Sequence, residues 1–320
     1  MTREDRPAVP RTPWGRFAAE ATTVVYVAAI AWIAKTSGLT YVMFPELAAL
    51  SHDIFTRPRG TWARAPGMLV LTPLLTALAG IGVTKLLPYG VWSILLTVGL
   101  SLGIIRLLHS PVAPAISAGL LPVTLGVSSW RYPPSLLVGL LLLAGLAQLR
   151  ARATARKDSG VAPDADDRRA DLIEETPRDY SWLLPYAMFI AGMAALAVNS
   201  GWRFLLFPPL AVIGFEMFAH AAICPWAKRP LRLPLACTLS AAVGALAVHA
   251  LGAGAPAAAI ACVFGVLILN VLDLHAPPAL AVGLLPFVMP TVDVRFPAAV
   301  GLGTAALTGS FIAWRRFGRH

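Results

Sequence analysis

Charged residues are scarce in this chain. They make up 13% of its 320 residues, whereas soluble domains carry roughly 25%, and hydrophobic residues make up 57%. This composition excludes an ordinary soluble fold and predicts an all-α, polytopic bundle of membrane helices with the lipid bilayer as its partner. The formal net charge of +10 does not indicate a nucleic-acid partner, because the lysines and arginines stand beside apolar segments instead of lining one helix face.

Cysteine is also rare, and the common catalytic motifs are missing. Cys224, Cys237 and Cys262 show no paired spacing, which excludes a disulfide framework and a zinc pattern. The chain has no H-E-x-x-H, no G-x-S-x-G and no G-x-x-x-x-G-K-[ST]. We therefore expect no enzyme activity, no metal and no cofactor, and any transport is expected to be passive or ion-coupled.

Apolar windows of about 20 residues predict the membrane spans, because a helix must pair its own backbone groups inside lipid. One further segment, 38–56, has the length of a span but carries Glu46, His52 and Asp53. The predicted spans are 17–35, 67–86, 91–108, 111–129, 133–149, 181–199, 204–222, 232–251, 255–273, 277–292 and 296–314.

The charged stretch 150–180 has no apolar period, so we expect a solvated linker that acts either as a tether or as a regulatory peptide. It separates a first membrane repeat, 1–149, from a second, 181–320.

The two predicted halves resemble each other at a constant offset of 164 residues. Gly119–Pro122 is repeated as Gly283–Pro286, and "WARAP" at 62–66 is matched by "WAKRP" at 226–230. Apolar bias does not align Trp, Arg, Gly and Pro in register, so the pattern predicts a tandem duplication. Phe44-Pro45 matches Phe207-Pro208 at an offset of 163, one residue less, which makes 38–56 a sixth crossing in the first half.

Charge gives a topology. With six crossings per half and the N-terminus inside, all but five of the 26 lysines and arginines fall on the cytoplasmic side, as the positive-inside rule requires. Both termini are then cytoplasmic, and the Ala-, Arg-, Gly- and Pro-rich composition favours a bacterial inner membrane. The five exceptions are Lys35, Lys85, Arg131, Arg203 and Arg295.

Two related segments carry a resemblance to a known family. "LHAPPALAVGLLP" at 274–286 and the looser copy "LHSPVAPAISAGLLP" at 108–122 resemble the His-Pro-Pro element of the HPP family of integral membrane proteins. Pro66 to Gly80 and Pro230 to Gly244 resemble its proline turn and small-residue helix, but Gly67 and Leu231 stand where that turn has arginine. Plant chloroplast and cyanobacterial members are associated with nitrite transport, so the resemblance implies a small inorganic anion as substrate.

The prolines in these segments indicate broken helices. Pro122 and Pro286 lack an amide proton, which is expected to leave the carbonyls of Ala118 and Val282 facing a polar path between the halves. Alternatively, the prolines fix tight turns and the histidines are interfacial. Arg131 and Arg295 either draw anions to a mouth or extend to headgroups beside Tyr132 and Phe296. The candidate pathway residues are His109, Pro111, Pro114, Pro122, His275, Pro277, Pro278, Pro286, Arg131 and Arg295.

Ionisable residues inside spans are costly and usually functional. Asp53 aligns with Glu216, and the pair is expected either to flank a central path or to lie at helix ends beside Arg57 or Lys228. The candidate gating or proton-relay residues are Glu46, Asp53, Glu216 and His220.

Three functions remain open from the sequence. The first is a transporter or channel for a small anion, with its site between the repeats. The second is a non-transporting membrane scaffold or assembly protein, for which a homo-oligomer is one option. The third is a channel for a small neutral solute.

Overall fold

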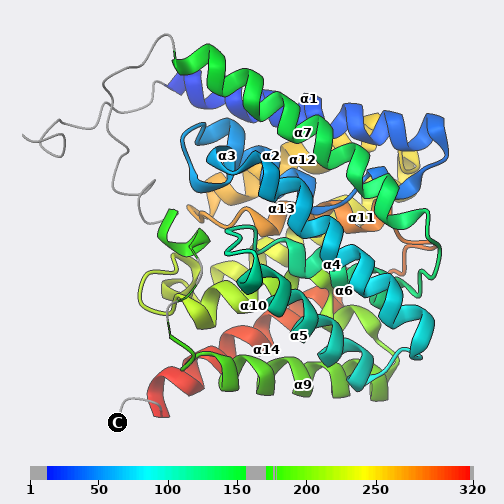
Figure 1. Ribbon diagram of the computed structural model, residues 1–320, viewed down its shortest axis with the longest axis vertical. Coiled ribbons are helices and arrows are strands. Elements are labelled where there is room, and N and C mark those ends of the chain that lie inside the picture. The colour runs from blue at the N-terminus through cyan, green and yellow to red at the C-terminus, as the bar shows by residue number, and fades with distance from the viewer. Residues whose placement is uncertain (1–12, 156–170, 176, 178, 318–320) are drawn as a thin grey trace, which may run out of the picture.

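A computed structural model describes residues 13–155, 171–175, 177 and 179–317. Within these residues the secondary structure consists of α- and 3-10 helices without a strand, and the helices lie side by side in one bundle (Figure 1). This arrangement confirms the predicted all-α class. A helix suits an apolar environment because it pairs its backbone groups within its own segment.

Six helices are long and apolar enough to cross a membrane. Two further helices of 17 residues, α5 (Val91–Leu107) and α12 (Ala255–Val271), accompany them. Large apolar side chains such as Trp32, Trp92 and Leu246 are exposed on the outer helices, as expected for surfaces that contact lipid. The six are α1 (Pro13–Ser37), α4 (Pro66–Leu86), α7 (Tyr132–Ala155), α9 (Leu183–Ser200), α11 (Arg232–Leu251) and α14 (Phe296–Phe317).

The basic residues separate between the two ends of the bundle, as predicted. At one end, Lys85 lies over the Trp130 ring, Arg203 over Tyr89 and Arg295 over Trp202. Lys35 reaches Gly254 there, and Arg131 directly follows Trp130. At the opposite end, where α1 begins and α14 ends, Arg16 donates to the Asn270 side chain, Arg232 to the Leu272 carbonyl and Arg315 to the Ala221 carbonyl.

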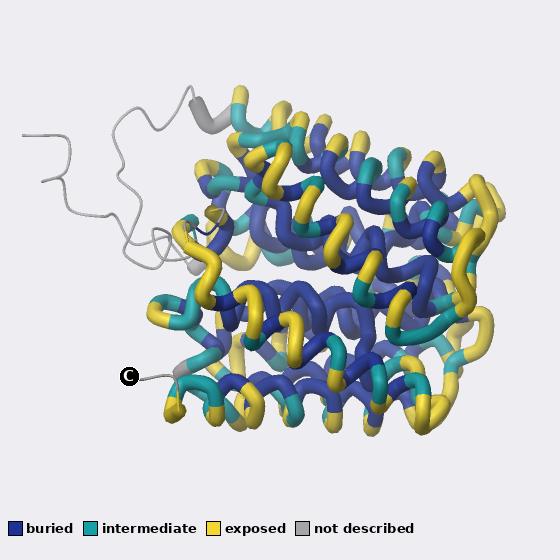
Figure 2. The backbone as a smooth tube through the Cα atoms, turned by 60° about the horizontal axis from the view of Figure 1, so that its bottom comes forward, coloured by how far each residue is buried: buried dark blue, intermediate teal, exposed yellow. Residues whose placement is uncertain are grey.

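Four short helices occupy the centre of the bundle. Each is buried along nearly its whole length, and Figure 2 shows a continuous buried interior inside a more exposed periphery. At 1.5 Å per residue, the three longest, with 11 or 12 residues each, extend about 17 Å, roughly half of the hydrocarbon thickness, and the fourth, with seven residues, is shorter. They are α2 (Glu46–Thr56), α6 (Ala115–Leu125), α10 (Pro208–Ala219) and α13 (Pro278–Leu284), the last continued by the 3-10 turn η4 (Leu285–Phe287).

We expected a helix over the full length of four segments, and this is wrong, because each helix occupies only part of its segment. The segments are 38–56, 111–129, 204–222 and 277–292. Each short helix follows a non-helical or 3-10 segment, such as η1 (Thr40–Val42) before α2 and η2 (Arg203–Leu206) before α10. Before α6 and α13 the chain turns sharply at His109 (φ 48°) and Asp273 (φ 45°), in the left-handed region that His and Asp adopt more readily than most residues.

Both carbonyls that the interior prolines release are hydrogen-bonded, which corrects the expectation that they are unpaired. The Tyr132 hydroxyl donates to the Ala118 carbonyl oxygen at 2.7 Å, and α6 continues through Pro122. Phe296, the counterpart of Tyr132 by sequence, has no hydroxyl. There the Leu285 N–H donates to the Val282 carbonyl, and α13 ends in the 3-10 turn that contains Pro286.

Glycine allows the central helices to touch the outer ones. A Cβ atom at Gly80 of α4 would overlap the carbonyl oxygen of Gly119 in α6, and one at Gly244 of α11 would overlap that of Gly283 in α13. The short helices also meet across the bundle, where α2 packs on α13 and α6 packs on α10.

We predict that Gly80→Ala and Gly244→Ala each destabilise the protein by about 1–3 kcal/mol, because the added methyl group forces two backbones apart. The check is the midpoint of thermal unfolding in detergent. Gly82→Ala is the matched control, since a Cβ there meets no atom within 4 Å. Equal midpoints for all three variants would contradict the close contacts.

Candidate functional site

The buried charges of the interior gather on the short helices. Glu46 is the first residue of α2, Asp53 lies near its last turn, and Glu216 lies near the end of α10. Each is at most 2% exposed. Such burial is expensive for carboxylates, so these groups are the first place to look for a function.

Glu46 lies where two helix N-termini come together. Ser117, in the first turn of α6, is the neighbouring hydroxyl group, and Tyr132 of α7 is also close. Among the described residues, neither Glu46 Oε1 nor Ser117 Oγ has a hydrogen-bond partner. The N-terminal dipoles of α2 and α6 favour negative charge here, yet the carboxylate has no cation beside it. This pair of unpartnered oxygens is suited to hold a proton or a bridging water.

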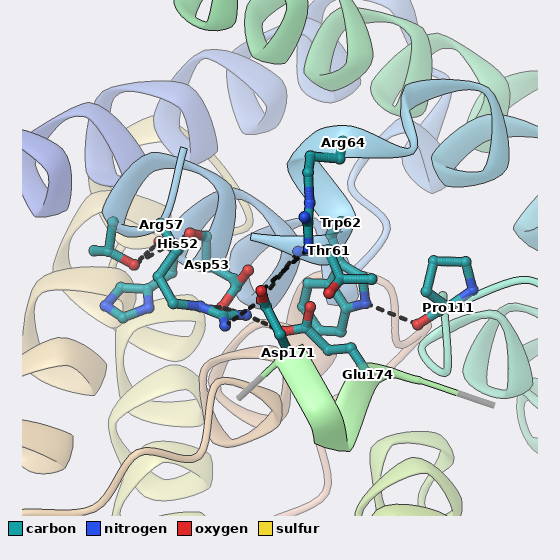
Figure 3. A network of polar contacts seen from close by, with 10 residues as sticks. His52, Asp53, Arg57, Thr61, Trp62, Arg64, Pro111, Asp171 and Glu174 are labelled. Atoms are coloured by element: carbon teal, nitrogen blue, oxygen red, sulfur yellow. Dashed lines mark hydrogen bonds and ion pairs between the residues drawn. The ribbon is translucent and has the colours of Figure 1, made fainter. Parts of the chain in front are cut away.

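A second cluster lies at the other end of α2, around Arg57 (Figure 3). Arg57 is 3% exposed, and its guanidinium binds Asp53 Oδ1 at 2.7 Å and Asp171 Oδ1 at 3.0 Å. It also forms an ion pair with Glu174. Asp171 accepts a hydrogen bond from the Thr61 N–H at 3.1 Å. Residues 171–174 are thereby tied to the bundle.

Negative charge exceeds positive charge in the Arg57 cluster. Three carboxylates contact one guanidinium, and Glu216 lies within electrostatic reach of Asp53 and Glu174. Asp53 Oδ2, Glu174 Oε2 and Glu216 Oε2 have no hydrogen-bond partner among the described residues. Burial and the charge of Asp53 raise the pKa of Glu174 well above its usual range, although Arg57 acts in the opposite direction. Docking of Glu174 in this cluster is therefore coupled to proton uptake.

The sequence did not predict that residues 171–174 pack against the bundle. Residues 150–180 were expected to be solvated, but Ile173 and Glu174 are buried. Farther along, Arg106 donates to the Pro177 carbonyl at 3.3 Å and lies over the Tyr180 ring. The one signal was the apolar pair Leu172-Ile173 inside a charged stretch.

The predicted pathway residues do not converge on one place. His109 and His275 are exposed in the loops after α5 and α12, at the end of the bundle that carries Arg16. Arg131 and Arg295 lie at the opposite end, and Arg295 stacks on Trp202 instead of a neighbouring ring. The prolines serve local structure: those at 114, 277 and 278 are buried where α6 and α13 begin, Pro122 and Pro286 lie within the short helices, and the Pro111 carbonyl accepts from the Trp62 indole.

Of the proposed relay residues, Asp53 adopts the helix-end pairing with Arg57 that the sequence had left as one alternative. The side chain of Lys228, named as the other possible cation, lies outside the described residues. His220 follows α10, and its Nε2 atom has no hydrogen-bond partner among the described residues.

The described residues contain no group of three or more His, Cys, Asp or Glu side chains that could hold a metal ion. Comparison with protein-family models, with curated proteins and with solved structures finds no match for this chain. The HPP resemblance therefore stays a prediction, and the argument on function depends on the site.

The docking of residues 171–174 is predicted to weaken as pH rises. A pKa that is raised in the docked state means that docking binds a proton, so docking is favoured at low pH and lost as pH rises through the docked pKa. The ionised Glu174 would face Asp53, Asp171 and Glu216, whose repulsion opposes the attraction of Arg57.

A single cysteine at Ile173 tests this docking through its labelling by a membrane-impermeant thiol reagent. The rate is divided by that of Leu172→Cys, an exposed neighbour that corrects for thiol ionisation. We expect the ratio to rise with pH in the wild-type background and to stay flat with Glu174→Gln. A ratio that is independent of pH in both backgrounds would show that Glu174 does not control docking.

Proposed function

We propose that the protein is a proton-coupled membrane transporter for a small inorganic anion. The observation that carries the proposal is Glu46, a buried carboxyl group whose Oε1 has no hydrogen-bond partner among the described residues, placed where the half-length helices α2 and α6 begin. Carboxyl groups in this situation serve as proton carriers in pumps and transporters. The binding sites of transporters are typically formed by half-length helices that end inside the bundle.

The anion class comes from the HPP resemblance, and the charges of the interior constrain how an anion would move. Glu46, Asp53 and Glu216 make the centre acidic, so an anion entering alone would be repelled. An anion that travels with a proton meets a neutralised carboxyl group instead. Nitrite is the member of the class that the resemblance suggests.

The two carboxyl groups on α2 give the proton two positions. Glu46 and Asp53 are seven residues apart, which is about 10 Å along a helix. A proton taken up at Glu46 would leave through the cluster of Asp53, Glu174 and Glu216. In the described conformation residues 171–174 cover this end of α2, so transport requires their release.

We further propose that residues 1–149 and 181–320 are tandem copies in the same orientation. The contact of Gly80 with Gly119 is repeated by Gly244 with Gly283, each 164 residues later. His109 and Asp273, also 164 residues apart, share the same left-handed turn. The short helices of the two copies meet where α2 packs on α13 and α6 packs on α10, and these contacts support a route between the copies.

With each short helix and its lead-in counted as one crossing, each copy crosses the membrane six times. The end of the bundle that carries Arg16, Arg57 and Arg315 is then cytoplasmic by the positive-inside rule, together with both chain termini. A bacterial inner membrane is the proposed location.

Proteoliposomes provide the test. An inward proton gradient is predicted to drive nitrite accumulation by the wild type, and Glu46→Gln is predicted to reduce it to the level of empty vesicles, because the amide cannot release a proton. Asp293→Asn, an exposed loop carboxylate at the opposite end from Arg57, is the matched control and should transport normally. Gradient-driven uptake by a folded Glu46→Gln variant at the wild-type rate would refute the role of Glu46. No uptake by a folded wild type would favour the scaffold or neutral-solute alternatives.

A further inference from the structure

A cleft of about 420 Å³ opens beside the last turns of α14, away from the short helices that carry Glu46 and Asp53. Phe311, Ile312, Arg315 and Arg316 of α14 form one wall. Three alanines from the turn after α10 and from η3 (Trp226–Lys228) form the other. No acidic residue among the described part of the chain lines it, so the charge of these lining residues is positive and the remainder of its surface is apolar.

The cleft is held in shape by contacts that need no ligand. Arg315 Nη1 donates to the Ala221 carbonyl at 2.7 Å, which connects α14 to the opposite wall. The Phe311 ring packs against Phe218 of α10 and Trp314, with centroids 5.7 and 5.9 Å away. Neither Arg315 nor Arg316 forms an ion pair with a described residue. Their remaining N–H groups are therefore available to an anion.

The position of the cleft selects the kind of anion. α14 is one of the six helices long enough to cross the membrane, and the cleft lies along its final two turns. At that depth lipid phosphates meet the first carbons of the acyl chains. An apolar wall that ends in two guanidinium groups matches a molecule with a hydrocarbon part and a phosphate part, and Arg recognises phosphate with paired hydrogen bonds.

We propose that this cleft binds an anionic glycerophospholipid. Arg315 and Arg316 hold the phosphate, and an acyl chain lies along Phe311 and Ile312. The carbonyl ends of α10 and α14 oppose an anion here, so binding depends on both guanidinium groups. The site is independent of the proposed transport function.

The test uses the full-length protein, delipidated in detergent and titrated with phosphatidylglycerol, with phosphatidylcholine or with inorganic phosphate. Binding is measured by native mass spectrometry and by the rise in unfolding temperature that a bound ligand produces. Wild type is expected to bind phosphatidylglycerol in preference to phosphatidylcholine, with inorganic phosphate giving no comparable effect. Arg315→Gln with Arg316→Gln is expected to weaken phosphatidylglycerol binding by about tenfold or more.

Two further variants separate the cleft from general charge. Lys35→Gln with Lys85→Gln removes the same charge at the opposite end of the bundle and should bind phosphatidylglycerol as wild type does. Ala222→Trp fills the cleft while keeping both arginines, and should lose the lipid. Unchanged binding in the double arginine variant and in Ala222→Trp would overturn the proposal. Equal binding of phosphatidylcholine would also overturn it. Full competition by inorganic phosphate would overturn it as well, because the cleft would then hold a phosphate ion alone.

Discussion

The rest of the structure depends on one constraint, that polar backbone groups buried in an apolar bundle must find partners inside it. The outer helices satisfy this constraint because each is long enough to pair its backbone groups within itself. The short central helices begin and end within the bundle, and the prolines at 122 and 286 leave the carbonyls of Ala118 and Val282 without their usual helical donors. The Tyr132 hydroxyl supplies one for Ala118. Where Phe296 replaces the tyrosine, the backbone itself tightens to a 3-10 turn and supplies the other, from Leu285 to Val282. The hydroxyl oxygen that Tyr132 has and Phe296 lacks thus accompanies a difference in how α6 and α13 end.

Glycine and charge then determine what the centre can do. The contacts at Gly80 and Gly244 bring the short helices close enough to exclude side chains between backbones. What remains polar in the centre is a small set of carboxyl groups, of which Asp53 and Glu174 have Arg57 as cation and Glu46 has none. Among the described residues Arg57 is the one buried cation, and an interior with this excess of carboxyl groups favours bound protons over bound anions. This is why the proposed anion transport is coupled to protons.

Much of the architecture was predictable because it follows from local composition. The helical class, the long spans and the separation of Lys35, Lys85, Arg131, Arg203 and Arg295 from the other basic residues follow from runs of apolar residues and their flanks. The lengths of α2 and α10 did not follow, because their apolar lead-in segments have the composition of a helix. The partners of Ala118 and Arg57 were also unpredictable. Glu174 lies 117 residues from Arg57, in a stretch whose composition indicates solvent, and only tertiary contacts bring the two together.

The most direct measurement of the central claim is the ratio of protons to anions moved by the wild-type protein. Proteoliposomes with an internal pH dye and an external nitrite electrode report both fluxes after an anion gradient is imposed without a pH gradient. Proton movement in the same direction as nitrite, at a fixed ratio, is the predicted result. Nitrite movement with no accompanying proton would contradict the account.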